Sequence, residues 1–95
     1  MRFESPDPAD RIRAIRRFAD EPADTSRSTV RAALVDRLDD EDAAVRFYAV
    51  AALARLTGRR FGYRAFDPAE RRRVAVDRWR LYLRDRVAPA RAAGR

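Results

Sequence analysis

The chain has 95 residues, a formal net charge of +7 and 46% hydrophobic residues, which is enough for one small domain with a single core. It contains no cysteine and no histidine, which excludes disulfides, cysteine-based zinc sites and the commonest general base. No apolar run approaches the roughly 18 residues that span a bilayer, and the N-terminus is polar from Arg2 to Arg17, so we expect a cytoplasmic protein without a secretory signal or membrane contact.

Charge is distributed unevenly along the chain. All 22 basic residues are arginine, and their abundance, like that of alanine, is interpreted first as the mark of a GC-rich coding sequence. Residues 1–42 carry eight arginines against eleven acids, a net of −3, whereas residues 43–95 carry fourteen against four, a net of +10. Such halves can attract an anionic partner or the opposite half of a second copy. Because the arginines are spread along the predicted helices rather than packed into a tail, the default interpretation is a solvated face with internal ion pairs.

Proline and glycine divide the chain into four predicted helices within a single domain over residues 1–95. The first begins at Asp7-Pro8, where aspartate caps the helix and proline takes a position whose missing N–H costs nothing. It ends near Asp20-Glu21-Pro22, and its apolar stripe consists of Ile12, Ile15, Phe18 and Ala19.

The second and third helices are predicted over residues 28–38 and 43–57. A polar linker at 23–27 precedes the second helix, with Ser26 or Ser28 as its cap. Asp42 is expected to cap the third helix, and Gly58 lies just past its end. Because the third helix is apolar on more than one side, it is the predicted central helix, with Leu53 deeply buried. Its main stripe is Val45, Ala49, Ala52, Leu53 and Leu56, and Phe47, Val50, Ala51 and Ala54 lie off that stripe.

The fourth helix opens with Asp67-Pro68-Ala69, which nearly repeats the start of the first. Val76, Trp79 and Leu83 share one face of it, so Trp79 is expected to close the core. Residues 88–95 are predicted to form a flexible tail. No segment alternates long enough to predict a strand, and the fold class is therefore all-α.

The stretch from Val30 to Gly58 consists of two apolar-faced helices joined by an acidic turn. Its pattern is Leu34, then Leu38-Asp39-Asp40-Glu41-Asp42, then Val45-Arg46, Ala49, Ala52-Leu53 and Leu56. This pattern resembles one unit of the HEAT-repeat family, best over residues 28–58. Residues 57–83 resemble a closing segment found after the last unit in some bacterial HEAT-repeat proteins. The resemblance implies a short α-solenoid fragment of about four helices that binds a protein partner, or itself, as an interaction or assembly module.

The resemblance also implies structural roles for the turn acids and the arginine that follows them. Asp39 and Asp42 with Arg46 are expected to form a ladder between units. One and a half units leave an open face, because stacked repeats depend on neighbours. Either the terminal helices seal that face or another protein covers it, and the partner-binding candidates are Ile12, Phe18, Phe47 and Val50 together with Ala54.

An arginine-rich region at residues 59–73 suggests an alternative function, a basic nucleic-acid-binding module. Phe61, Tyr63 and Phe66 interleave with its arginines, a composition suited to phosphate contacts and base stacking. The same aromatics can instead anchor a loop. The candidate nucleic-acid residues are Arg59, Arg60, Arg64, Arg71, Arg72 and Arg73.

Catalytic chemistry finds no support in the residue types. The hydroxyl side chains have no histidine or lysine to activate them, and there is no glycine-rich phosphate loop. The four consecutive acids at 39–42 lack the alternating ligand spacing and glycine turn of a calcium loop. We therefore expect no enzyme activity, no catalytic residue, no metal and no cofactor.

Overall fold

The computed structural model describes residues 3–20 and 28–87, and within these ranges it contains four helices and no strand. They are α1 (Pro8–Asp20), α3 (Ser28–Arg37), α4 (Ala43–Thr57) and α5 (Ala69–Val87). For the described residues, the prediction of an all-α fold with four helices is confirmed. The predicted linker at 23–27, the capping candidate Ser26 and the predicted tail at 88–95 lie outside the described residues.

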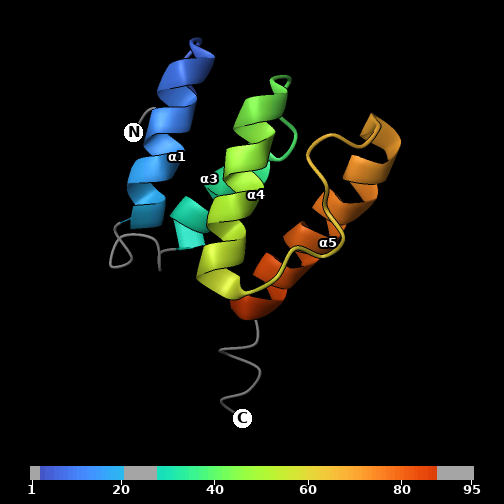
Figure 1. Ribbon diagram of the computed structural model, residues 1–95. Helices are drawn as coiled ribbons and strands as arrows, with labels where there is room; N and C mark the ends of the chain where they lie inside the picture. Colours follow the sequence, from blue (N-terminus) through green and yellow to red (C-terminus); the bar gives the residue numbers. More distant parts are fainter. Residues whose placement is uncertain (1–2, 21–27, 88–95) are drawn as a thin grey trace.

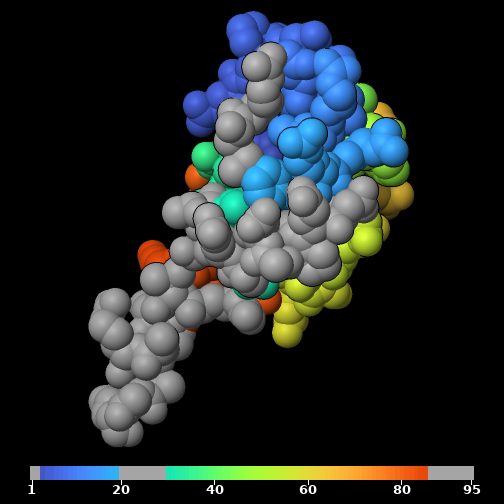
Figure 2. Space-filling view, turned by 90° about the vertical axis from the view of Figure 1, so that its left-hand side faces the viewer, coloured from blue at the N-terminus to red at the C-terminus, as the bar shows by residue number. Residues whose placement is uncertain are grey.

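The helices form two layers. In Figure 1, α1 and α4 lie side by side and run in the same direction, while α3 runs the opposite way behind them and α5 lies behind on the other side of α4. Figure 2 shows the molecule from the α1 side, with α1 over the upper part of that face and α4 along its right-hand edge. One layer is therefore α1 with α4, and the other is α3 with α5.

Helix α4 is the central element, because it packs against both α1 and α3, whereas α5 packs mainly against α3. Its start is fixed by Asp42, whose Oδ1 accepts the N–H of Val45 at 3.0 Å. Its end is fixed by Gly58, which adopts a left-handed φ of 74° and donates its N–H to the Ala54 carbonyl at 2.7 Å. This conformation favours glycine, as expected just past a helix. Leu53 is fully buried in the core.

The two similar helix openings differ by one residue. Pro8 is the first residue of α1, and Asp7 Oδ1 accepts the N–H of Ala9 at 3.0 Å, as predicted for a capping aspartate. Helix α5 instead begins at Ala69, and the carbonyl of Pro68 accepts its first helical bonds, from the N–H groups of Arg71 and Arg72. The two similar sequences thus both start a helix, but Pro8 is the first residue of α1, whereas Pro68 is the residue before α5.

The segment between α4 and α5 forms part of the core. Tyr63 is buried, and its hydroxyl donates to the Leu38 carbonyl at 2.5 Å. The indole N–H of Trp79 donates to the Arg60 carbonyl at 3.1 Å, and the Phe61 ring meets the indole edge-on with centroids 4.8 Å apart. Trp79 itself is fully buried, so its predicted position in the core is confirmed.

Candidate functional site

Asp40 organises the acidic turn. Its carboxylate is buried and pairs with Arg11 of α1, whose Nη2 donates to Oδ1 at 3.0 Å and whose Nε lies 2.9 Å from Oδ2. Arg37 of α3 donates to Oδ2 at 3.2 Å, and the main-chain N–H of Asp42 donates to Oδ1 at 2.9 Å. One carboxylate therefore joins α1, α3 and the start of α4, a structural role.

Arg46 is also buried, but its guanidinium bonds main-chain carbonyls. Its Nε donates to Ala65 at 3.0 Å, and its Nη1 donates to Asp40 at 2.8 Å and to Glu41 at 3.2 Å. The predicted pairing of Arg46 with Asp39 and Asp42 is therefore wrong. Asp39 is exposed, and Asp42 accepts the α4 N–H of Val45 instead. The buried ion pair at the turn instead joins Asp40 to Arg11 of α1. The sequence pattern did not indicate this pair, because nothing distinguishes Asp40 from the three acids beside it.

The acids of the turn do not assemble a metal site. Within residues 3–20 and 28–87, no group of three or more carboxylates is placed to hold a metal ion.

The predicted partner-binding residues divide into three cases. Val50 is 2% exposed and belongs to the core, so its assignment to an open face is wrong. The apolar character of α4 on several sides reflects the number of its neighbours inside the fold. Ile12 and Phe18 are half-buried against the core, with Phe18 tilted against Phe3 at 5.3 Å. Phe47 is 47% exposed and stays a candidate.

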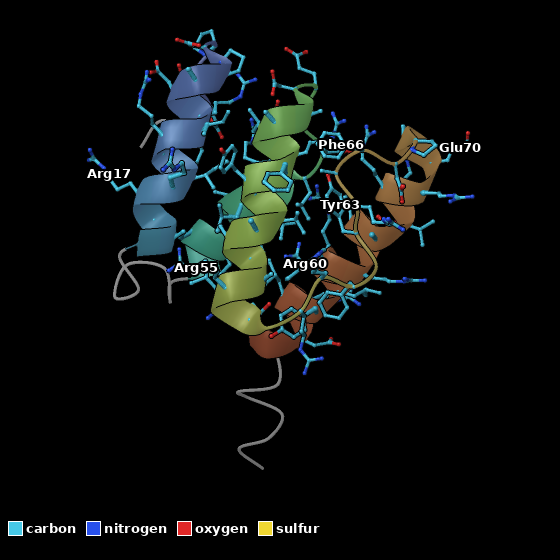
Figure 3. The ribbon with its side chains drawn as sticks, viewed as in Figure 1. Arg17, Arg55, Arg60, Tyr63, Phe66 and Glu70 are labelled. Atoms are coloured by element: carbon cyan, nitrogen blue, oxygen red, sulfur yellow. The ribbon has the colours of Figure 1, made fainter. Side chains whose placement is uncertain are left out.

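Phe47 is the centre of a row of contacts that crosses the α1/α4 layer. Its ring stacks on that of Phe66 with centroids 6.3 Å apart, and Phe66 is 74% exposed. On its other side, Tyr48 meets Phe47 edge-on at 5.5 Å, and the Arg16 guanidinium lies over the Tyr48 ring at 5.9 Å. Figure 3 shows Phe66 on the segment that connects α4 to α5. We call Phe66, Phe47, Tyr48 and Arg16 the aromatic row.

Sequence reasoning found only part of the aromatic row. It assigned Phe47 to a partner face and Phe66 to the arginine-rich region, and it did not single out Tyr48 or Arg16. The adjacency of Phe47 and Tyr48 was the available signal. Two consecutive aromatics on a helix point about 100° apart, so both cannot enter the same core.

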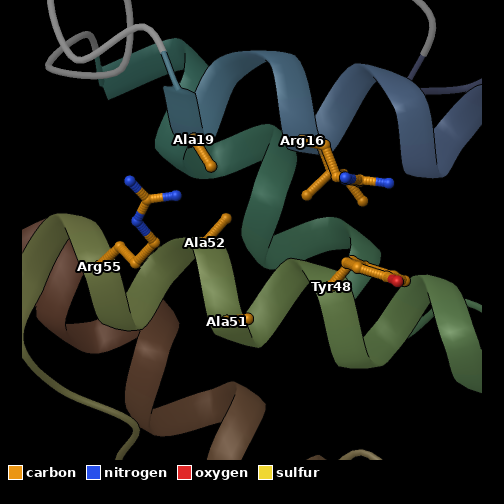
Figure 4. Close-up of a pocket in the computed structure, with 7 residues that line it drawn as sticks. Arg16, Ala19, Tyr48, Ala51, Ala52 and Arg55 are labelled. Carbon is orange, nitrogen blue, oxygen red and sulfur yellow. The ribbon is translucent and has the colours of Figure 1, made fainter.

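A groove lies beside Tyr48, between α1 and α4, with a volume of ≈ 220 Å³. Figure 4 shows Arg16 and Tyr48 toward one end of the groove and Arg55 toward the other. Between them the lining consists of Ile15, Ala19, Ala51 and Ala52. Among the described residues that line the groove, the charged ones are Arg16 and Arg55.

The arginine-rich region forms an extended band. The Arg60 carbonyl accepts a hydrogen bond from the indole N–H of Trp79, and the Arg72 side chain donates to the Asp67 carbonyl at 2.8 Å. The earlier residue of the segment between α4 and α5 thus pairs with the later residue of α5, so the segment runs antiparallel to α5. Arg59 lies over the ring of Tyr82 at 5.5 Å. Because Arg72 and Tyr82 are ten residues apart on one helix, the ends of the band are about 15 Å apart. We call Arg59, Arg60, Arg64, Arg71, Arg72 and Arg73 the arginine band.

The aromatics near the arginine band are mostly used inside the fold. Phe61 is half-buried against Trp79, and Tyr63 is buried. Burial raises the pKa of Tyr63 to about 12, against the opposing effect of the nearby positive charges of Arg46 and Arg72. Of the three aromatics that suggested base stacking, Phe66 is the exposed one, and its ring already stacks on Phe47.

Comparison with protein-family models, with curated proteins and with solved structures finds no match. Among the described helices, none has the length and apolarity needed to cross a bilayer.

Proposed function

We propose that this chain is a non-catalytic protein-interaction or assembly module that contacts its partner through the aromatic row. The observation that carries the proposal is the stacked pair of Phe47 and Phe66, two large apolar rings exposed side by side. Contiguous exposed apolar surface on small proteins commonly marks an interaction site, and aromatic side chains supply much of the binding energy at interfaces.

We further propose that the module is a short HEAT-like stack. The parallel course of α1 and α4 supports this, since second helices of successive hairpins in a stack run in one direction. The antiparallel α3, joined to α4 by the acidic turn, would complete one hairpin. In this proposal α1 is the second helix of a preceding hairpin, and α5 closes the stack beside α3.

The test compares two pairs of exposed apolar residues. The double variant Phe47→Ser with Phe66→Ser removes the centre of the aromatic row, whereas Val74→Ser with Leu81→Ser removes two apolar side chains of α5 that are about half exposed. Self-association is measured by sedimentation over a range of concentrations. Co-purification is measured from a nuclease-treated native cell extract.

The proposal expects association or co-purification in the parent chain, loss in the Phe47/Phe66 variant and retention in the α5 variant. A strictly monomeric, stable parent chain with no recoverable partner would contradict it, because the terminal helices would then already close the stack. Equal losses in both variants would also contradict it, since the aromatic row would have no special role.

Nucleic-acid binding is the second candidate function, and the exposed arginines of the arginine band favour it. Arg60, Arg64, Arg71 and Arg73 are all exposed along α5 and the segment beside it. The burial of Tyr63 and the packing of Phe61 weigh against it, because bases would find few free rings to stack on.

A further inference from the structure

We propose that the face around the Phe47/Phe66 pair binds the same face of a second copy of this chain, forming a two-fold dimer. This inference rests on the proposed function and deepens it by naming the partner. It combines the exposed aromatic pair with two neighbouring regions of opposite charge, the acidic turn and the arginine band.

The acidic end of the molecule is built from two segments, residues 3–13 and 36–46. Arg11 joins them, because its Nη1 donates to the Ser5 carbonyl at 2.6 Å and its Nη2 donates to the Asp40 carboxylate at 3.0 Å. Together the two segments hold eight acids and four arginines, a net charge of −4. This end is therefore negative, although the chain as a whole is positive.

The region that contains the arginine band has the opposite charge. Residues 58–80 hold eight arginines and three acids, a net charge of +5. One ion pair connects this region to the acidic end within the chain, since Arg80 donates to Asp36 at 3.3 Å. Leaving that pair out of both sums gives −3 for the acidic end and +4 for residues 58–80. The chain thus carries two complementary charged regions. The three acids of residues 58–80 are Asp67, Glu70 and Asp77.

Both charged regions adjoin the aromatic pair. The Arg46 guanidinium donates to the Glu41 carbonyl at 3.2 Å and to the Ala65 carbonyl at 3.0 Å, so the acidic turn lies beside the residue that precedes Phe66. Figure 1 shows the acidic turn leading into the start of α4, and Figure 3 shows Phe66 between α4 and the start of α5. The Phe47/Phe66 pair therefore lies between the acidic turn and the first turn of α5, where the arginine band continues.

A two-fold axis makes this face complementary to itself. Such an axis brings the same surface patch of both copies together, so that every contact between two different residues forms twice. An axis that passes through the aromatic pair and between the two charged regions places the acidic turn of each copy on the start of α5 of the other. The aromatic pairs then meet at the centre, and unlike charges meet on both sides of them.

The aromatic pair alone is too small for a stable dimer. If each ring offers about 200 Å² when fully exposed, exposures of 47% and 74% give roughly 240 Å² per copy. A stable interface buries about 800 Å² on each partner. The charged regions must therefore take part in the contact. The exposed charged side chains that we assign to it are Asp39, Glu41, Arg64, Arg71 and Arg73.

A partner with one sign of charge fits this face less well. The phosphates of a nucleic acid would be attracted by the arginine band, but the acidic turn beside the same rings would repel them. A second copy presents both signs of charge at the positions where each is needed. Nucleic-acid binding is therefore the competing outcome of the test.

Sedimentation of the nuclease-treated full chain over a range of concentrations measures the dimer. We use about 0.1 M and about 1 M salt, where charges act over about 10 Å and about 3 Å. The dimer should dissociate at least about tenfold more readily at the higher salt, because the attraction between unlike charges is then screened. A dimer that tightens with salt, a series of ever larger assemblies, or association that needs added single-stranded poly(U) would each overturn the proposal.

Two charge-reversal variants test the pairing of the acidic turn with α5. Asp39→Arg with Glu41→Arg makes the turn basic, and Arg71→Glu with Arg73→Glu makes the start of α5 acidic. Each variant alone should dimerise at least about tenfold more weakly than the parent chain, because like charges then meet twice. An equal mixture of the two should recover the affinity of the parent chain, since the reversed turn of one variant meets the reversed helix of the other.

Recovery in the mixture separates a binding role from a folding defect, because two misfolded variants would not restore each other. Circular dichroism compares the helix content of each variant with that of the parent chain. If a double variant is less helical, the single reversals Glu41→Arg and Arg71→Glu are mixed in the same way. Folded variants whose mixture binds no more tightly than either variant alone would overturn the proposal.

A matched control changes the net charge elsewhere on the surface. Arg17→Glu with Arg84→Glu reverses two exposed arginines, one on α1 and one near the end of α5, and alters the net charge as much as the Arg71/Arg73 variant does. It should dimerise as tightly as the parent chain. An equal loss in these two variants would overturn the proposal, because net charge and not position would then decide the affinity.

The two proposals fail in different ways. If the parent chain is monomeric but a different protein co-purifies with it and is lost from the Phe47/Phe66 variant, the interaction module stands and the two-fold dimer is wrong. If the parent chain shows no association of any kind, the proposed function itself fails.

Discussion

Arginine side chains have opposite roles in two regions of the molecule, the turn around Asp40 and the arginine band. At the turn, Arg11 and Arg46 are buried, and their guanidinium groups donate to fixed acceptors at 2.6 to 3.2 Å. Along the band, most arginines extend into solvent, and Arg59 lies over aromatic rings. A buried arginine without its acceptors is costly, whereas an exposed one contributes little. A high arginine content therefore does not by itself locate a binding surface in this chain.

Breaking the turn should have the largest effect. Asp40→Ala leaves Arg11 buried without its carboxylate, and removing one partner of a buried ion pair typically costs about 3–5 kcal/mol. The free energy of unfolding, measured by urea denaturation, should fall by that amount. Asp39→Ala, at the exposed neighbouring position, should change it by less than about 0.5 kcal/mol. Similar losses in the two variants would contradict the central role of Asp40.

The apolar core beneath the turn provides the next comparison. Leu53→Ala removes a fully buried side chain from α4 and should cost about 2–5 kcal/mol. Arg13→Ala removes an exposed arginine that pairs with Asp10 on the surface of α1, and it should cost well under 1 kcal/mol, roughly the worth of an exposed pair. Equal, small losses in denaturation would show that α4 is not the centre of the core.

Alkaline pH should weaken the hydrogen bond by which the Tyr63 hydroxyl, in the segment between α4 and α5, holds the Leu38 carbonyl before the acidic turn. The folded-state pKa of Tyr63 is raised to about 12. The folded chain therefore keeps the hydroxyl proton at pH values where the unfolded chain, with the ordinary tyrosine pKa of 10.0, has lost it. This contribution to stability is fully present below pH 10 and is lost as pH rises through about 12. Tyr63→Phe should be less stable at neutral pH, because it lacks the bond to Leu38, and should lose less stability on going to alkaline pH.

Ultraviolet absorbance checks the same point independently. The tyrosinate signal of the parent chain minus that of the Tyr63→Phe variant should develop with a midpoint of about 12. A difference signal that develops with a midpoint at 10 would contradict the burial of this hydroxyl.

The smallest effects are expected in the arginine band. Replacing Arg71, Arg72 and Arg73 together by glutamine should change stability only slightly, mainly through the bond from Arg72 to the Asp67 carbonyl.

Binding of the parent chain to poly(U) should be weak and should disappear near physiological salt, because it would rest on counterion release. The triple variant should flatten that salt dependence. Tight binding of the parent chain at physiological salt would favour the nucleic-acid function instead.

Local signals allowed most of the fold to be predicted. Asp7, Asp42 and Gly58 have side-chain or backbone preferences that act within one turn of helix, and each lies where the sequence placed it. Periodicity was enough to bury Leu53 and Trp79. The second helix ends at Arg37, one residue before the predicted boundary, as is usual where a helix passes into a turn.

The candidate site was harder to predict, because it depends on contacts between distant residues. Val50 and Phe47 are both apolar and both lie off the main stripe of α4, yet one is buried and the other exposed. The neighbours of each residue decide the difference, and these come from other elements. The stacking of Phe66 on Phe47 and the pairing of Arg11 with Asp40 likewise join residues 19 and 29 positions apart. No local pattern encodes such pairs.

The buried polar bonds at the turn also bear on how the chain unfolds. Arg11, which bonds the Asp40 carboxylate, lies 29 residues before Asp40 in the sequence. Tyr63, whose hydroxyl bonds the Leu38 carbonyl, lies 25 residues after Leu38. Losing either α1 or the segment after α4 would therefore leave charged or polar groups at the turn without partners, so partly folded forms are penalised. Simple stacks can fray unit by unit from their ends. This chain should instead unfold in one cooperative step, with helix content and tryptophan fluorescence lost at the same temperature.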